Sequence, residues 1–411
     1  MDKPQRIEDL SHPLLTPMIE AAIAAAPHIV FSRASVLQAA QAQTGLSDFG
    51  APDFKNRLDI WLQSFEEDKG LNALGRASLW ADCVRLASTR LRFEDAWKRH
   101  PEIADISIDR PIMIAGLPRS GTTHLVNLLA ADDRLRSLTL WESMDPIART
   151  EPAPLPADDP RRAECMAMWS MFEAMLPLMP AMHEMAPDGI HEDIELHAPD
   201  FTGYLMEWVS RPYRWRAYYL AQDQTPHYAY AKRLLQYLTW VRGPNRWVLK
   251  SPPHMENLAA LAAVHPDAAV IITHRDPLAV LQSAITMIAY GDRIRRQINL
   301  KELAIYWTDR IDALLQRCVE QRSRVPRAMD VRFQDYMADE MGVIERAYAL
   351  ADLDLNDAAR ARISAYREAN PRGKHGSIAY DLRGQFGLDP DALWERFRFY
   401  TDRFEIEREV F

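Results

Sequence analysis

The residues with the clearest chemistry form the stretch GLPRSGTT at positions 116–123, between the apolar run PIMI and the apolar segment HLVNLLAA. A strand, a tight turn and a helix N-terminus direct several backbone N–H groups at one point, where the helix dipole also favours an anion. An arginine in the turn can bind phosphate oxygens in a bidentate manner. The predicted phosphate-binding residues are Arg119, Ser120, Gly121, Thr122 and Thr123.

This loop differs from that of the P-loop nucleoside triphosphatases. Their pattern has a lysine directly after the second glycine, where it reaches the β- and γ-phosphates. Here Thr122 follows Gly121, the nearest cation is Arg119, and no convincing acidic magnesium ligand is present. The loop therefore predicts a phosphate that is held rather than cleaved.

A second cluster, ITHRDPLAVLQS, places Arg275 at the end of a predicted strand and Ser283 eight residues later in the following helix. Both side chains can face the sheet edge that carries the glycine loop, and both suit a second phosphate. One ligand with two separated, intact phosphate groups argues against ATP chemistry. It indicates 3′-phosphoadenosine 5′-phosphosulfate (PAPS) as a co-substrate.

With these motifs the sequence resembles the PAPS-dependent sulfotransferases, in particular the bacterial branch and the protein-tyrosine sulfotransferases. The resemblance covers roughly residues 106–400, about three quarters of the chain. Its four elements are PRSGTT (118–123), LKSPPHMENL (249–258), VRFQDY (331–336) and a segment before FGLD (386–389). The resemblance implies that the glycine loop binds the 5′-phosphosulfate, and that Arg275 and Ser283 bind the 3′-phosphate.

The resemblance also implies a segment that closes over the nucleotide, here with Arg372, Lys374 and His375. Lys250, at the end of a predicted strand, matches the family's lysine before the 3′-phosphate motif. Sulfuryl transfer develops charge on the bridging and peripheral oxygens, by analogy with phosphoryl transfer, and fixed cations must meet it. We assign this role to Arg119 and Lys250, and we expect no metal to be required.

A general base must also take the proton of the acceptor. Glu142, in TLWESMDP, is expected to end the second strand at the same sheet edge, and it resembles the glutamate base of the tyrosine-protein sulfotransferases. His254, in LKSPPH, resembles the region of the catalytic histidine in cytosolic sulfotransferases. We favour Glu142, and His254 and His191 remain alternatives. The stretch HEDIELH (191–197) lacks the spacing of a zinc-binding helix.

These residues require a P-loop-type α/β fold with three layers and a central, mainly parallel sheet. Strands are predicted within 110–116, 135–142, 245–251, 268–275 and 328–336. We expect a helical N-terminal extension (1–105), an α/β domain (106–411) and, within it, a mainly helical insertion (150–245) that covers the active site.

Composition narrows the remaining possibilities. A net charge of −9 argues against nucleic-acid partners, three dispersed cysteines suit a reducing compartment, and no apolar run could span a membrane. We expect a cytoplasmic enzyme with a small-molecule or lipid acceptor, and a homo-oligomer is possible. The methionine-rich run at 165–185 could be core or could line an apolar acceptor pocket. A P-loop kinase or triphosphatase and a catalytically idle nucleotide-binding scaffold are the alternative functions.

Overall fold

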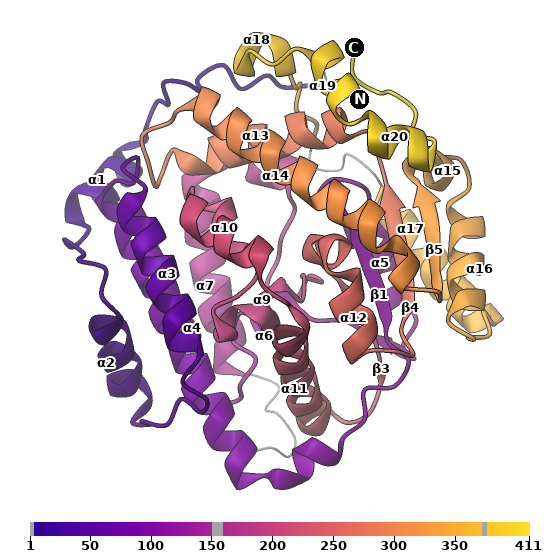
Figure 1. The fold of residues 1–411 in the computed structure, drawn as a ribbon, viewed down its shortest axis with the longest axis horizontal. Coiled ribbons are helices and arrows are strands. Elements are labelled where there is room, and N and C mark those ends of the chain that lie inside the picture. The colour runs from indigo at the N-terminus through magenta and orange to yellow at the C-terminus, as the bar shows by residue number, and fades with distance from the viewer. Residues whose placement is uncertain (1–3, 150–158, 372–375) are drawn as a thin grey trace.

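The central feature of the molecule is a parallel β-sheet, seen in a computed structural model that describes residues 4–149, 159–371 and 376–411 (Figure 1). The sheet has five strands in the order β2-β3-β1-β4-β5, and all its pairings are parallel. The strands are β1 (Ile112–Gly116), β2 (Leu135–Arg136), β3 (Arg246–Lys250), β4 (Ala269–His274) and β5 (Ala328–Arg332). The predicted α/β class with a parallel sheet is confirmed.

The central strand β1 is buried on both faces, which gives the fold its three layers. Met113 and Ala115 belong to one apolar core and Ile112 and Ile114 to another, because successive side chains of a strand point to opposite faces. The first core includes side chains of α11 (Thr225–Arg242), α12 (Leu258–Val264), α13 (Pro277–Asp292) and α14 (Leu300–Gln321). The second includes side chains of α5 (Thr122–Ala130), α16 (Glu340–Leu350) and α17 (Asp357–Ala369).

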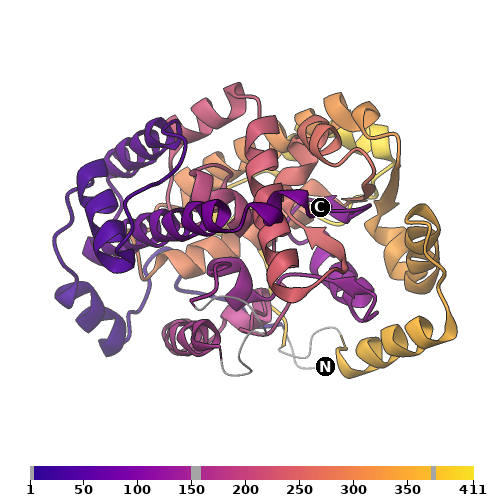
Figure 2. The same ribbon diagram turned by 90° about the horizontal axis from the view of Figure 1, so that it is seen from below.

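The other helices form three groups along the chain, before β1, between β2 and β3, and after β5. Before β1 are α1 (Pro17–Ala25), α2 (Arg33–Thr44), α3 (Phe54–Glu67) and α4 (Ala73–Arg99). Between β2 and β3 are α6 (Leu140–Met144), α7 (Pro160–Met175), α8 (Met179–Met182), α9 (Ile194–His197) and α10 (Tyr213–Ala221). Beyond β5 are α15 (Phe333–Ala338), α18 (Leu382–Phe386), α19 (Pro390–Arg396) and α20 (Arg398–Phe404). Two views place α1–α4 and α15–α17 at opposite ends of the molecule (Figures 1 and 2).

Two predicted strands are much shorter than expected. The strand predicted at 135–142 ends at Arg136, because the following residues pair with the insertion instead of β3: Thr139 forms an antiparallel bridge with Ile190. The strand predicted at 328–336 ends at Arg332, whose guanidinium donates to Asp335 one turn into α15. The other three strands lie within their predicted ranges.

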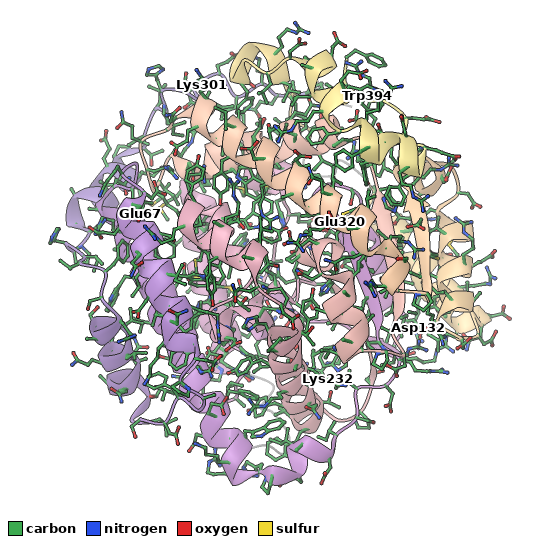
Figure 3. The ribbon with its side chains drawn as sticks, in the orientation of Figure 1. Glu67, Asp132, Lys232, Lys301, Glu320 and Trp394 are labelled. Carbon is green, nitrogen blue, oxygen red and sulfur yellow. The ribbon has the colours of Figure 1, made fainter. Side chains whose placement is uncertain are left out.

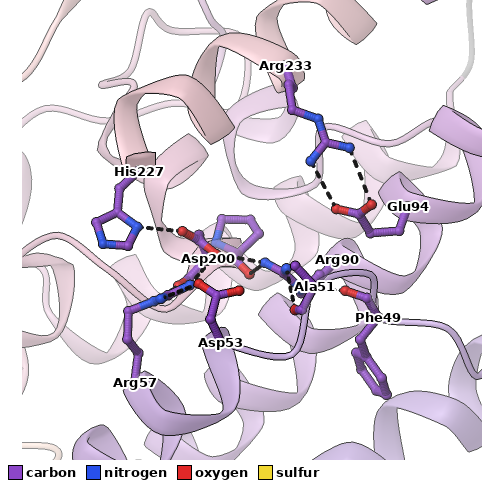
Figure 4. Close-up of polar contacts among 10 residues, drawn as sticks. Phe49, Ala51, Asp53, Arg57, Arg90, Glu94, Asp200, His227 and Arg233 are labelled. Carbon is purple, nitrogen blue, oxygen red and sulfur yellow. Dashed lines mark hydrogen bonds and ion pairs between the residues drawn. The ribbon is translucent and has the colours of Figure 1, made fainter. Parts of the chain in front are cut away.

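A buried ionic cluster joins the N-terminal helices to the region between β2 and β3 (Figure 4). The Asp200 carboxylate accepts hydrogen bonds from Arg57 of α3 at 2.5 Å and from Arg90 of α4 at 2.8 Å. Its other oxygen lies 2.6 Å from Nδ1 of His227 on α11. Burial alone would raise the pKa of Asp200, but His227 and the two arginines bring it below its ordinary value. The N-terminal helices are therefore part of the same packed structure.

The outer surface of the helices carries charged side chains, among them Glu67, Lys301 and Glu320 (Figure 3). Within the described ranges, no helix combines the length and apolar character that crossing a bilayer requires.

Candidate active site

The predicted glycine loop connects β1 to α5 through a tight turn. Gly121 precedes the helix with φ of 86°, a backbone conformation that favours glycine. A Cβ on Gly116 would lie 2.0 Å from Oγ1 of Thr273, so no larger residue fits there. The Ser120 hydroxyl donates to the carbonyl of Leu117 at 2.6 Å and lies 2.7 Å from the same threonine hydroxyl. These contacts bind the loop to β4.

Arg119 lies at the centre of the site. Its φ of 68° is in the left-handed region, which residues other than glycine rarely adopt and which is enriched at functional sites. Its Nε donates to the Ser283 hydroxyl at 3.0 Å, and the Tyr380 hydroxyl also hydrogen-bonds to it. Burial and the nearby charge of Arg275 lower the pKa of Arg119. Its guanidinium therefore lies in an environment where an anion would be favoured.

The structure brings the second predicted cluster to this loop. Arg275 directly follows β4, and its Nη1 donates to the Arg119 carbonyl at 2.6 Å. The guanidinium lies over the ring of Phe333, 4.0 Å from its centroid. Ser283 is buried in α13. Arg275 and Ser283 thus both contact Arg119, as their predicted position at the sheet edge requires.

Lys250 lies at the end of β3, as predicted, and its ammonium points at the first turn of α5. Its Nζ donates to the Thr123 hydroxyl at 3.3 Å and to Oε1 of Glu192 at 2.5 Å. Glu192 is positioned by the backbone on either side: His191 N donates to the Leu138 carbonyl, and Asp193 N donates to the Lys250 carbonyl. A carboxylate, an ammonium and a loop hydroxyl therefore meet at one point.

The lowered pKa values of two histidines reflect a positive electrostatic potential around this point. Burial and the charges of Arg119 and Lys250 lower the pKa of His183 to about 3. Burial, Lys250 and His183 lower the pKa of His191 to about 3 as well. Both imidazoles are therefore neutral near pH 7, and a bound anion would reduce the positive charge that disfavours their protonation.

Glu142, the favoured base, does not end a strand. It lies in α6 and is buried, and its Oε1 accepts 2.8 Å ion pairs from Arg136 and from Arg242. Its Oε2 is buried without a hydrogen-bond partner among the described residues. Neither arginine belongs to the glycine loop. The predicted location of Glu142 was wrong because the chain leaves the sheet at Arg136.

His254 belongs to an inner polar cluster behind Lys250. It lies in a 3₁₀ turn (Pro252–Glu256), and its Nδ1 is 2.8 Å from the Tyr228 hydroxyl. Its Nε2 is 3.1 Å from Oδ2 of Asp193. Burial alone would raise the pKa of Asp193, but His254 and His197 bring it below its ordinary value. None of these neighbours belongs to the glycine loop, but Asp193 links His254 to Lys250 because its N–H donates to the Lys250 carbonyl.

Two residues of this site were not singled out from the sequence, and three predicted ones cannot be placed. Glu192 was part of a recognised acidic stretch, HEDIELH, but its contact with Lys250 arises from the irregular chain path of the insertion. Tyr380 gave no signal of its own. The predicted nucleotide-covering residues Arg372, Lys374 and His375 lie outside the described residues.

The methionine-rich run at 165–185 divides into two parts. Met179 and Met182 are buried in the core, whereas Met166, Met168 and Met171 on α7 are exposed. The core interpretation therefore holds for Met179 and Met182, and the acceptor-pocket interpretation of the rest of the run stays a prediction.

Comparisons with known proteins show the family to which the chain belongs. Residues 111–357 match the family described as the sulfotransferase family. The chain is similar to the crystal structure of sulfotransferase STF9 from Mycobacterium avium, with 28% identity, a TM-score of 0.82, and coverage of 93% of this chain and 99% of that one. It is also similar to sulfotransferase STF1 from Mycobacterium tuberculosis H37Rv, with 27% identity, a TM-score of 0.77, and coverage of 89% and 98%. No curated protein matches significantly in sequence. The chain belongs to the sulfotransferase family.

Proposed function

We propose that this protein transfers the sulfuryl group of PAPS to a hydroxyl or amine of a small-molecule or lipid acceptor. The observation that carries the proposal is the convergence of three cations on one glycine loop. Arg275 contacts the Arg119 carbonyl, and Lys250 contacts Thr123 in the first turn of α5. A donor with two separated anionic groups can be held at two ends of such a site, and the family match supports a sulfuryl donor.

In this reaction the bond between sulfur and the bridging oxygen breaks, and a bond between sulfur and the acceptor atom forms. The leaving group is 3′-phosphoadenosine 5′-phosphate (PAP), on which negative charge grows. Lys250 and Arg119 are the cations that we assign to this charge, together with the N–H groups of the loop. The acceptor loses a proton, which a base must receive.

We assign the base to Glu192 in preference to Glu142. The Glu192 carboxylate lies 2.5 Å from the Lys250 ammonium, so a proton acceptor is placed beside a cation of the transfer site. One oxygen of Glu142 already accepts two ion pairs from arginines outside the loop. His254 is engaged with Tyr228 and Asp193. His191 remains a second candidate because its imidazole is neutral near pH 7.

We propose an apolar or aromatic acceptor, because the exposed methionines of α7 provide adaptable apolar surface. A transfer screen with sulfur-labelled PAPS tests the function. Phenols, sterols, glycolipids, sugars and amines are the acceptor classes, and labelled ATP with release of phosphate is the parallel assay. Transfer to one acceptor class supports the proposal. ATP turnover without sulfuryl transfer favours the kinase alternative, and tight PAP binding without any transfer favours an idle scaffold.

A further inference from the structure

The guanidinium fork of Arg275 already holds a carboxylate from a distant part of the chain. Its Nε donates to Oε1 of Glu409 at 2.9 Å, and its Nη2 donates to Oε2 of the same residue at 2.7 Å. This is the two-point geometry with which arginine binds either a carboxylate or a phosphate. The third nitrogen, Nη1, is engaged by the Arg119 carbonyl. Glu409 therefore occupies the side of Arg275 that is best suited to a phosphate group.

Glu409 is held at this place by its own backbone. Its N–H donates to Oδ2 of Asp276 at 2.7 Å, and the next N–H, of Val410, donates to the same oxygen at 3.1 Å. Asp276 directly follows Arg275, and its Oδ1 caps α13 by accepting from Leu278 N. The backbone anchor and the side-chain ion pair are separate contacts, so the carboxylate can leave the guanidinium while the segment stays attached.

The ion pair is only partly shielded from water, so little free energy is needed to separate Glu409 from Arg275. The side chains of Arg275 and Glu409 are 22% and 34% exposed. Ion pairs of this exposure contribute little to stability, because solvent and salt screen them. A ligand phosphate with more charge and more acceptor oxygens can therefore displace the carboxylate. If the carboxylate remained in place, the two anions would repel each other.

We propose that Glu409 competes with the 3′-phosphate of the donor and of PAP for Arg275, and thereby weakens the binding of 3′-phosphorylated nucleotides. The proposal rests on the proposed function, since it assumes that Arg275 receives this phosphate. When PAP leaves, the ion pair between Glu409 and Arg275 forms again, so the guanidinium always has an anionic partner. Nucleotides that lack a 3′-phosphate are not subject to this competition.

The test compares PAP with adenosine 5′-monophosphate by titration calorimetry at one fixed ionic strength, using the full chain and the variants Glu409→Gln and Glu405→Gln. Glu405 is the matched control because it lies in the same segment and pairs with Arg332, with its side chain 80% exposed. We expect Glu409→Gln to tighten PAP binding roughly two- to fivefold, the range for loss of a partly exposed ion pair. Binding of the 5′-monophosphate should not change in either variant, and Glu405→Gln should leave PAP binding unchanged.

Three results would overturn the inference while leaving the proposed function intact. Unchanged PAP affinity in Glu409→Gln would show that there is no competition. Weaker PAP binding would show that Glu409 orients Arg275 for the phosphate. Equal tightening of both nucleotides would show a general effect of charge. If the unaltered protein does not bind PAP, the proposed function and this inference both fail.

Discussion

Replacement of Glu192 by glutamine tests the assignment of the general base. A positioned base typically contributes about 10²–10⁴-fold to the rate, so turnover should fall by about this factor. Glu192→Gln also removes the negative charge 2.5 Å from the Lys250 ammonium, which makes the site more positive. PAP affinity should therefore stay the same or increase. A loss of turnover without a loss of PAP binding separates the base from an ordinary binding residue.

The change has a structural cost that must be measured as well. Lys250 is only 3% exposed, and an unpaired buried charge can cost about 3–5 kcal/mol of stability. Thermal unfolding of the variant shows whether the protein is still folded under assay conditions. Glu192→Asp keeps the charge and should recover part of the turnover.

Glu142→Gln is the matched control, because Glu142 is a buried glutamate with two ion pairs of its own. The assay is initial-rate sulfuryl transfer at saturating PAPS, with kcat and KM measured for each variant. We expect Glu142→Gln to lower stability while most of the turnover remains. If Glu192→Gln keeps near-normal turnover and Glu142→Gln or His254→Ala does not, our assignment is wrong and the base is the residue whose loss matters.

Three further predictions concern metals and stability. Sulfuryl transfer should survive EDTA, since we assign the stabilising charge to side chains; complete loss that magnesium restores would argue for metal-dependent chemistry. Asp200→Asn should cost about 3–5 kcal/mol of unfolding free energy, because it removes the carboxylate that pairs with the buried Arg90 and leaves the buried Arg57 paired with Asp53 alone. The control Asp53→Asn, at a side chain 61% exposed, should cost about 1 kcal/mol or less. Similar values for the two variants in denaturant titrations would refute this account. Burial lowers the pKa of His265 to about 4, below the ordinary 6.5. As the pH drops from about 6.5 towards 4, His265 is therefore protonated in the unfolded chain but not in the folded one, and the free energy of unfolding falls. Between pH 7 and pH 5 the free energy of unfolding of His265→Gln, measured with urea, should therefore fall by about 2 kcal/mol less than that of the unaltered protein. The control His28→Gln, at an exposed position, should show the same pH dependence as the unaltered protein. If His265→Gln also shows that pH dependence, the assignment is contradicted.

The residues predicted best from the sequence lie where a strand meets a helix. Arg275 and Ser283 follow β4 at a spacing that regular geometry converts into a position at the sheet edge, and both contact Arg119. The glycine loop was predictable for the same reason, since its glycines and its helix start are local features. The sheet itself followed from buried apolar runs such as that of β1.

Contacts made by segments without regular secondary structure could not be predicted from the sequence. Glu192 reaches Lys250 because residues on either side of it form backbone hydrogen bonds to Leu138 and Lys250. Glu142 pairs with Arg242, which lies about a hundred residues further along the chain. Local periodicity carries no information on such pairs. The stretch after Arg136 alternates like a strand, but its partner is the segment around Ile190, and only the tertiary structure shows this.

The central claim is that the site holds a nucleotide by two separately anchored phosphate groups. Its most direct test is the affinity of PAP and of adenosine 5′-monophosphate for the unaltered protein and for Arg275→Ala, measured by calorimetry. Charge-assisted hydrogen bonds contribute about 1.5–3 kcal/mol each, and part of this is offset by breaking the existing pair with Glu409. We predict that PAP binds more tightly than the monophosphate and that Arg275→Ala weakens PAP at least roughly tenfold, with little effect on the monophosphate. Equal affinities for the two nucleotides, or unchanged PAP binding in Arg275→Ala, would contradict the account.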